Sequence, residues 1–193
     1  MPALTKHAAR NLARKQRKLL SPKEILQYNK QLLGRFSALP FEGIRYLHSF
    51  LPLETHVEPN TLLLLNWLRD HHPAVHVVLS KSEPEHSHMR HFLWDEHSVL
   101  HTNRWGIPEP VGGTEVRADI LDVVLVPLLM FDLHGNRVGY GKGFYDRFLS
   151  QCRPDSLKIG LSFFDPVSEI SDVSAHDIRL NACITPEKIW WFT

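Results

Sequence analysis

The hydrophobic and polar positions of the first 36 residues follow the pattern of two helices. Residues 4–19 contain no glycine or proline and many strong helix formers. The segment Ser21-Pro22-Lys23-Glu24 predicts the start of a second helix, with Ser21 as the N-cap, Pro22 at the first helical position and Glu24 completing a capping box. We expect this second helix to continue to about Phe36.

Beyond residue 40, short apolar segments alternate with helical patterns. Residues 80–118 are different, because they are polar, rich in histidine and interrupted by proline and glycine. They indicate one or two strands with long loops over a binding cleft. The predicted strands are residues 44–51, 75–79, 123–126, 158–162 and a last short one at 182–185, and the predicted helices are residues 60–70 and a segment that begins near Phe144.

Strands that alternate with helices favour an α/β fold with a parallel sheet. A chain of 193 residues with 43% hydrophobic content is long enough for one domain with a continuous core. The sequence contains no internal repeat, low-complexity tract or linker-like shift in composition. We therefore expect residues 1–193 to form a single-domain three-layer sandwich, in which helices flank a mostly parallel sheet.

Composition and charge narrow the choice of partners. The 22 basic and 21 acidic residues nearly cancel, which argues against a general attraction to nucleic acid or an anionic membrane. The longest apolar run, residues 123–131, is well below the roughly 18 residues that cross a bilayer. Cys152 and Cys183 have neither disulfide-framework nor zinc-site spacing. We expect a soluble, cytoplasmic monomer that binds small molecules, with no nucleic-acid or membrane partner.

The most informative segment is a glycine-rich loop that follows the apolar run. Gly139, Gly141 and Gly143 stand at alternate positions, with Arg137, Lys142 and Asp146 beside them. Glycines let backbone N–H groups approach a phosphate, the two cations balance its charge, and a carboxylate suits magnesium. The spacing is neither a Walker motif nor a dinucleotide fingerprint. A hairpin turn at Gly135-Asn136, or a helix packed closely on its strand, are the structural alternatives.

Two further patterns have several interpretations. Lys6, Arg10, Arg14 and Lys18 recur every four residues, so they could form a solvated helix face, a nucleic-acid or targeting segment, or an arm over the phosphate site. The densest histidine group lacks metal-ligand spacing, and we expect surface histidines there. Its members are His86, His88, His91, His97 and His101.

Four blocks of sequence, in order, resemble the 5-formyltetrahydrofolate cyclo-ligase family. The most specific block is residues 127–149, which looks like the ATP loop of that family. The others are residues 6–10, the Ile107-Pro108-Glu109-Pro110 segment, and His176-Asp177 followed by residues 184–186. The resemblance implies an α/β sandwich that converts 5-formyltetrahydrofolate and MgATP to 5,10-methenyltetrahydrofolate, ADP and phosphate.

The resemblance also implies roles for individual residues. Lys142 and Arg137 would be catalytic, and Asp146 and Asp177 would hold Mg²⁺. The folate would contact Leu53, Glu58, Trp105 and Tyr145, with Met89 nearby. ATP would be bound by Lys6, Arg10, Arg14, Arg137, Gly139, Tyr140, Gly141, Lys142, Gly143, Phe144 and Tyr145.

One departure from the family concerns the folate end of the site. The family commonly has Glu-Val-Asp/Glu-Thr where this chain has His56-Val57-Glu58-Pro59. Glu58 is kept, and its carboxylate could accept hydrogen bonds from the adjacent N–H groups of a pterin ring. The changed neighbours concern substrate preference, and an ATP-dependent enzyme for another amide-like substrate is one alternative. A separate alternative is a nucleic-acid-binding module that uses the basic helix, with a purely structural glycine loop.

Overall fold

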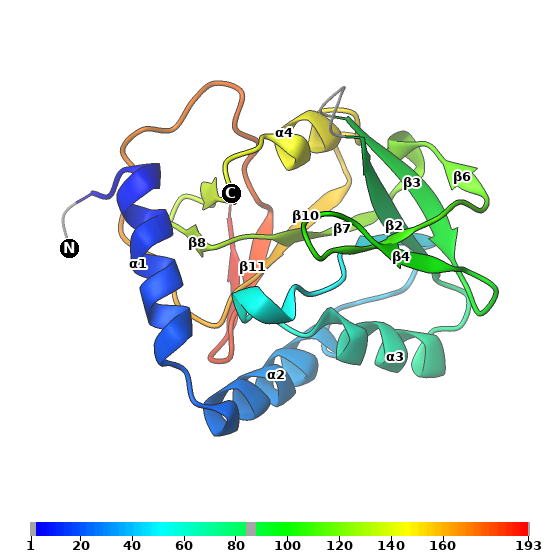
Figure 1. Ribbon diagram of the computed structural model, residues 1–193, viewed down its shortest axis with the longest axis horizontal. Helices are drawn as coiled ribbons and strands as arrows, with labels where there is room; N and C mark the ends of the chain where they lie inside the picture. Colours follow the sequence, from blue (N-terminus) through cyan, green and yellow to red (C-terminus); the bar gives the residue numbers. More distant parts are fainter. Residues whose placement is uncertain (1–2, 84–87, 193) are drawn as a thin grey trace.

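The computed structural model describes residues 3–83 and 88–192, and it begins with the two predicted helices (Figure 1). Helix α1 is Lys6–Leu19 and helix α2 is Pro22–Phe36. The Ser21 side chain accepts from the Glu24 N–H, and the Glu24 side chain accepts from the Ser21 N–H, so the predicted capping box is confirmed. Local sequence signals therefore fix this helix start.

An eight-stranded sheet, with the order β12-β11-β10-β7-β1-β2-β3-β6, forms the centre of the described structure. Its middle strands β11, β10, β7, β1 and β2 are parallel, and the strands β12, β3 and β6 pair antiparallel at the two sides. The predicted mostly parallel sheet is confirmed. The strands are β1 Tyr46–Ser49, β2 His76–Glu83, β3 His88–Trp94, β6 Glu115–Val116, β7 Val123–Pro127, β10 Leu157–Leu161, β11 Ala182–Ile184 and β12 Ile189–Trp191.

Helices cover both faces of this sheet. In Figure 1, α2 and α3 (Thr61–His71) lie below it, and the short α4 (Phe144–Leu149) lies above. One apolar cluster packs between the sheet and α2 and α3, with Leu32, Phe36 and Leu64 at most 2% exposed. A second cluster lies on the face that carries α4 and includes Phe148. The α/β sandwich with helices on both faces is thus observed.

Two small antiparallel pairs are added to the main sheet. Strand β8 (Met130–Phe131) pairs with β9 (Arg137–Val138), and Gly135 in the connecting turn has φ of +79°. A Cβ at Gly135 would lie 2.8 Å from the Phe192 ring, so both the turn and the packing require glycine there. The hairpin alternative for Gly135 is therefore correct. Strands β4 (Leu100–Thr102) and β5 (Pro108–Pro110) form the other pair.

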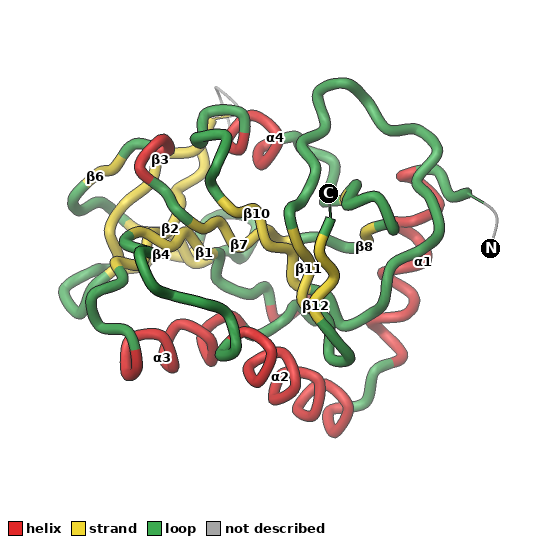
Figure 2. The backbone as a smooth tube through the Cα atoms, turned by 180° about the vertical axis from the view of Figure 1, so that it is seen from behind, coloured by secondary structure: helices red, strands yellow, loops and turns green. Residues whose placement is uncertain are grey.

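The structure differs from the predicted elements at three places. The strand at Ala182 is not the last one, because β12 follows it and closes that side of the sheet (Figure 2). The segment 80–118 supplies half of β2 and all of β3 to β6, and it ends where a short 3-10 turn, Ala118–Ile120, begins. The helix at Phe144 has only 6 residues. No helix within the described ranges is long and apolar enough to span a membrane.

Candidate active site

A cavity of about 440 Å³ opens where two neighbouring parallel strands end. Residues 49–51 line it at the end of β1, and Pro127 lines it at the end of β7. Beyond β1 the chain continues to β2 on one side, whereas beyond β7 it continues through β10 to β11 on the other. Such a switch in strand order leaves a crevice that commonly binds ligands in open α/β sheets.

The glycine-rich loop and helix α1 form one wall of this cavity. Gly139, Gly141 and Gly143 all line it. The Arg10 Nε donates to the Gly139 carbonyl oxygen at 3.0 Å, which ties the helix to the loop. Gly141 has φ of +93°, and a Cβ there would lie 3.4 Å from the Arg10 guanidinium. Glycine at position 141 thus permits both the backbone conformation and the approach of Arg10.

Two ion pairs join predicted phosphate ligands to predicted metal ligands. Lys6 Nζ pairs with Asp177 Oδ2, and Arg137 Nη2 pairs with Asp146 Oδ1 at 2.7 Å. The Ile178 N–H also donates to Asp146 Oδ1 at 3.2 Å, which brings the two aspartates into one neighbourhood. The four side chains come from distant parts of the chain, yet they all line the cavity.

Burial and pairing shift the pKa values of these charged groups. The Arg137 side chain is 4% exposed, and burial lowers its pKa although Asp146 opposes the change. Burial of Asp177 favours its neutral form, but hydrogen bonds from Lys6 and the Ser174 N–H outweigh this, so the Asp177 pKa is lowered. The ordinary pKa of an arginine is so high that Arg137 stays charged despite this lowering. Arg137 and Asp177 are therefore charged near neutral pH.

Two cations at the cavity have no carboxylate partner within the described ranges. The Lys142 side chain is exposed and makes no hydrogen bond or ion pair with the described residues, and Arg10 bonds only to the Gly139 carbonyl. An anionic ligand would gain charge-assisted hydrogen bonds from both side chains. The glycine-rich end of the cavity is therefore suited to phosphate.

Arg14 is the one predicted site residue that does not line the cavity; it is exposed on α1. Arg17 is the arginine that turns inward, with Nη2 donating to the Leu128 carbonyl at 2.6 Å. At 3.6 residues per turn, a residue seven positions after Arg10 returns to within about 20° of it, whereas one four positions later is rotated by about 40°. Counting the helical angle would have selected Arg17.

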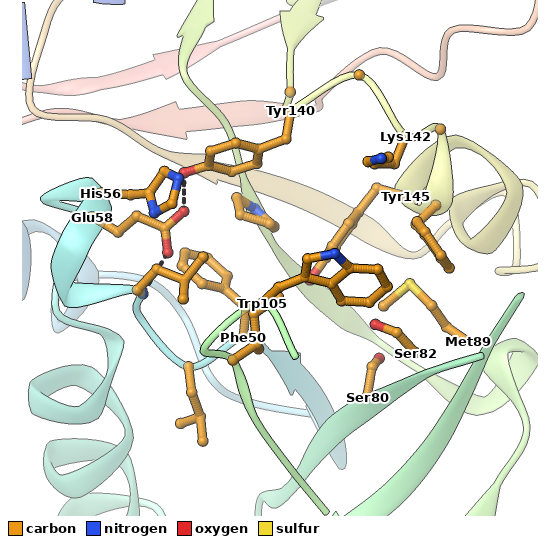
Figure 3. Close-up of a pocket in the computed structure, with 18 of the residues that line it drawn as sticks. Phe50, His56, Glu58, Ser80, Ser82, Met89, Trp105, Tyr140, Lys142 and Tyr145 are labelled. Carbon is orange, nitrogen blue, oxygen red and sulfur yellow. Dashed lines mark hydrogen bonds between the residues drawn. The ribbon is translucent and has the colours of Figure 1, made fainter. Parts of the chain in front are cut away.

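Arg17 connects the loop to the predicted folate end of the cavity. Its Nη1 donates to the Tyr140 hydroxyl at 3.3 Å and to the His56 carbonyl at 3.2 Å. The Tyr140 hydroxyl in turn donates to Glu58 Oε1, while the Leu53 N–H donates to Glu58 Oε2 at 2.8 Å (Figure 3). Burial, followed by the Glu58 charge, raises the Tyr140 pKa. These hydrogen bonds hold the Glu58 carboxylate in one orientation, and the residue is only 8% exposed.

Apolar and aromatic side chains make up the opposite part of the cavity. Leu53, Met89, Trp105 and Tyr145, which the family resemblance places near a folate, all line it. The Trp105 ring is 38% exposed and has the Arg104 guanidinium 4.6 Å from its centroid. A flat, partly apolar ring system would be covered by these side chains, whereas its polar edge would face Glu58 (Figure 3).

Several polar residues of the cavity were not identified from the sequence, and Ser80, Ser82 and Glu109 are among them. Ser80 and Ser82 stand at alternate positions of β2 and line the cavity. Glu109 also lines it, is 7% exposed, and accepts the Ser82 N–H at 3.0 Å. The signal was present in part, because two serines with a spacing of two interrupt an apolar strand and therefore share one face of it.

A transition-metal site is not present among the described residues, since no group of three or more His, Cys, Asp or Glu side chains could hold a metal ion. His86 lies outside the described residues. His91 is buried rather than on the surface, whereas His88, His97 and His101 are exposed. The carboxylates best suited to a metal are Asp146 and Asp177, each with one oxygen that accepts no hydrogen bond from the described part of the chain.

Comparison with known proteins gives a consistent result. Residues 3–186 match the 5-formyltetrahydrofolate cyclo-ligase family. The chain is 28% identical over 186 residues to the 5-formyltetrahydrofolate cyclo-ligase of Escherichia coli K12, an alignment that covers 93% of this chain and 99% of that protein. A probable 5-formyltetrahydrofolate cyclo-ligase of Schizosaccharomyces pombe is 28% identical over 127 residues, or 58% of this chain and 62% of that protein.

A solved structure is similar over almost the whole chain. The NMR structure of Aquifex aeolicus 5,10-methenyltetrahydrofolate synthetase aligns with a TM-score of 0.79 at 26% identity, covering 96% of this chain and 92% of that one. The similarity therefore includes the sheet, the glycine-rich loop and the helices that bound the cavity.

Proposed function

The chain belongs to the 5-formyltetrahydrofolate cyclo-ligase family, and we propose that it uses MgATP to cyclise 5-formyltetrahydrofolate to 5,10-methenyltetrahydrofolate, with release of ADP and phosphate. The observation that carries this proposal is the continuity of the cavity. A phosphate-binding end with Lys142 and Arg10 and a ring-binding end with Glu58 and Trp105 share a single space. A formyl group at the junction would therefore face the terminal phosphate of a nucleotide.

The nucleotide would lie along the glycine-rich loop. Backbone N–H groups near Gly141 and Gly143 would contact the triphosphate, with Lys6, Arg10 and Arg137 around it. Lys142 would neutralise charge that builds up on the transferring phosphoryl group, because its side chain is long, exposed and unpaired within the described residues. Tyr140 and Phe144 line the same wall.

The two aspartates fit a magnesium ion that accompanies the nucleotide. Mg²⁺ prefers one or two carboxylates together with phosphate oxygens and water, and Asp146 and Asp177 each have one carboxylate oxygen that accepts no hydrogen bond from residues 3–83 or 88–192. When bound, the ion would neutralise phosphate charge and keep the reacting groups aligned.

The reaction itself needs positioning more than a strong base. The formyl oxygen attacks the γ-phosphorus, the bond to the β-phosphate oxygen breaks, and ADP leaves. N10 of the folate then attacks the activated formyl carbon, the C–O bond to phosphate breaks, and the N10 proton leaves with the phosphate, which gives the methenyl bridge. Glu58 would hold the pterin ring through its adjacent N–H groups, while Tyr140 and the Leu53 N–H keep the carboxylate oriented.

An absorbance assay tests the proposal. Purified protein, 5-formyltetrahydrofolate and Mg²⁺ should produce the absorbance of methenyltetrahydrofolate only after ATP is added. Lys142→Ala should lower kcat by about 100-fold to 1000-fold, the usual cost of one charge-stabilising donor. Lys30→Ala, an exposed lysine on α2, is the matched control and should keep full activity. Folded wild-type protein that hydrolyses ATP with another amide, and not with this folate, would refute the assigned substrate.

The cellular setting and assembly state are part of the same proposal. Both cysteines are free thiols, and Cys183 is buried, which fits a reducing compartment such as the cytoplasm. We also expect a monomer. Size-exclusion chromatography with light scattering, at assay concentrations, measures this directly, and a stable dimer would contradict it.

A further inference from the structure

Three polar side chains from neighbouring strands meet behind the ring-binding end of the cavity. His48 lies on β1, Ser80 on β2 and His91 on β3. The His48 Nε2 is 2.6 Å from the Ser80 Oγ, and the His91 Nδ1 is 2.9 Å from the same oxygen. One serine hydroxyl therefore lies between two imidazoles.

The two imidazoles are buried and pack on the same aromatic side chain. His48 is 0% exposed and His91 is 4% exposed. Their rings pack on Phe148 of α4 at centroid distances of 4.7 and 4.2 Å. Burial is the main cause that lowers the pKa of both, with that of His91 falling to about 4. Both imidazoles are therefore neutral at pH 7, and each has one N–H and one lone pair.

Counting donors and acceptors decides what Ser80 can offer a ligand. The hydroxyl has one proton and two lone pairs. If it donates to one imidazole and accepts from the other, one lone pair remains. If both imidazoles donated, the hydroxyl proton would have no partner among the described residues, which is less favourable.

The unpaired nitrogen of His48 determines which group donates in each of these hydrogen bonds. His48 Nδ1 has no hydrogen-bond partner in the described structure. An unpaired lone pair there costs less than an unpaired buried N–H, so the proton is on Nε2. His48 thus donates to Ser80, Ser80 donates to His91, and the second lone pair of Ser80 is left for the cavity.

Ser80 lies at the cavity surface, on the side away from Glu58. It lines the cavity, whereas both imidazoles stay behind it. Figure 3 shows its hydroxyl pointing toward the side of the cavity that Met89 and Trp105 bound, with Glu58 across the space. A ligand ring held at one edge by Glu58 would therefore present its other part to Ser80.

We propose that Ser80, oriented by His48 and His91, is a specificity-determining residue that accepts a hydrogen bond from the N–H of the reduced half of a tetrahydropterin ring. This inference rests on the proposed folate substrate. Once Glu58 has accepted the adjacent donors of the pyrimidine half, the remaining ring N–H is N8–H, which exists in reduced pterins and is absent from the fully oxidised ring. Ser80 would thus distinguish reduced from oxidised folates.

Binding of two ligands to two variants tests this role. Quenching of tryptophan emission, which includes Trp105 at the cavity, gives dissociation constants for 5-formyltetrahydrofolate and for folic acid without turnover. Ser80→Ala should weaken binding of the reduced ligand roughly tenfold, as expected for one buried hydrogen bond, and leave that of folic acid within twofold. In the assay, KM for the folate should rise by the same factor, with kcat and the KM for ATP within twofold.

Two further variants separate this role from a structural one. Ser80→Thr retains the hydroxyl and should keep the wild-type preference for the reduced ligand. Ser37→Ala removes a serine hydroxyl at the end of α2, outside the cavity, and should behave as wild type. If Ser80→Ala does not fold, Ser80→Cys replaces it under the same criteria, because sulfur is a weak acceptor.

The outcomes distinguish this inference from the proposed function. Equal loss of affinity for both ligands, or no loss for either, in a protein that cyclises the folate normally overturns the role of Ser80 alone. Wild-type protein that neither binds nor cyclises 5-formyltetrahydrofolate overturns the proposed function, and the role of Ser80 with it. If Ser80→Ala narrows the preference for the reduced ligand and Ser80→Thr keeps it, the results support both the role of Ser80 and the proposed function.

Discussion

Two arginines one turn apart on α1 have opposite surroundings. Arg17 is 4% exposed and donates to two backbone carbonyls and the Tyr140 hydroxyl, whereas Arg14 is exposed. Removal of Arg17 would leave these acceptors unpaired in a buried position.

We therefore expect Arg17→Met to lower the free energy of unfolding by about 2–4 kcal/mol. Arg14→Met should change it by less than about 0.5 kcal/mol, as is usual for surface positions. Urea titrations of both variants measure the difference. Equal stability of the two would show that the Arg17 hydrogen bonds contribute little.

Two glycines of the loop also differ in what they require. Gly141 has φ of +93° with Arg10 close to the place of a Cβ, whereas Gly139 has an ordinary φ and no atom within 4 Å of that place. Gly141→Ala should cost about 1–2 kcal/mol through backbone strain. Gly139→Ala should be neutral or slightly stabilising, because it restricts the unfolded chain. Thermal unfolding of the pair checks this, and the reverse order would refute the strain argument.

At the scale of secondary structure elements, the start of α2 is held by a reciprocal pair of hydrogen bonds. Ser21→Ala removes the acceptor for the Glu24 N–H and should lower stability by about 1 kcal/mol. Because α2 does not line the cavity, kcat and KM should not change. Circular dichroism melts alongside the absorbance assay test both statements, and a change in KM would mean that α2 affects the site.

The elements that could be predicted are those with local signals. The capping box, the apolar strand at Val123 and the glycine spacing are each set by residues close in sequence. Strand β12 has 3 residues and no such signal, so only its pairing with β11 defines it. The contact of His48, Ser80 and His91 depends on the register of three strands, which neighbouring residues do not determine.

The same distinction between local and non-local signals applies to the residues of the candidate site. The family resemblance placed residues that lie in contiguous motifs, and all of them except Arg14 line the cavity. Residues that reach the cavity from a strand carry no motif of their own, so Ser80 and Glu109 required the folded chain. Arg17 does not line the cavity itself, and its inward position follows from its helical angle relative to Arg10.

At the scale of the whole molecule, the two buried histidines make stability depend on pH. Their folded-state pKa values are lowered, so below about pH 6.5 the unfolded chain binds protons that the folded chain does not. The contribution of the two neutral imidazoles to stability is then fully present above that pH, and it is lost as the pH falls toward about 4, the pKa of His91. Each imidazole should contribute roughly 1.4 kcal/mol per pH unit within this window.

Urea unfolding at pH 7 and pH 5 measures this slope. His91→Gln should reduce it by about half, and His101→Gln, an exposed histidine, should leave it unchanged. The interval avoids pH 4 and below, where Asp177, whose pKa is lowered, would also lose its contribution on protonation. The same slope in all three proteins would mean that the His91 imidazole does not resist protonation.

The ion pairs of Lys6 with Asp177 and of Arg137 with Asp146 set a condition on what can enter the site. A free nucleotide that recruits the two cations leaves two carboxylates facing its own phosphates, and a free metal ion that recruits the carboxylates leaves two cations facing it. Only a metal–nucleotide complex brings both partners at once, so that each pair is exchanged for a new pair and no charge is left alone. For the proposed MgATP cosubstrate, the resting ion pairs would thus favour the complete metal–nucleotide complex over either part alone.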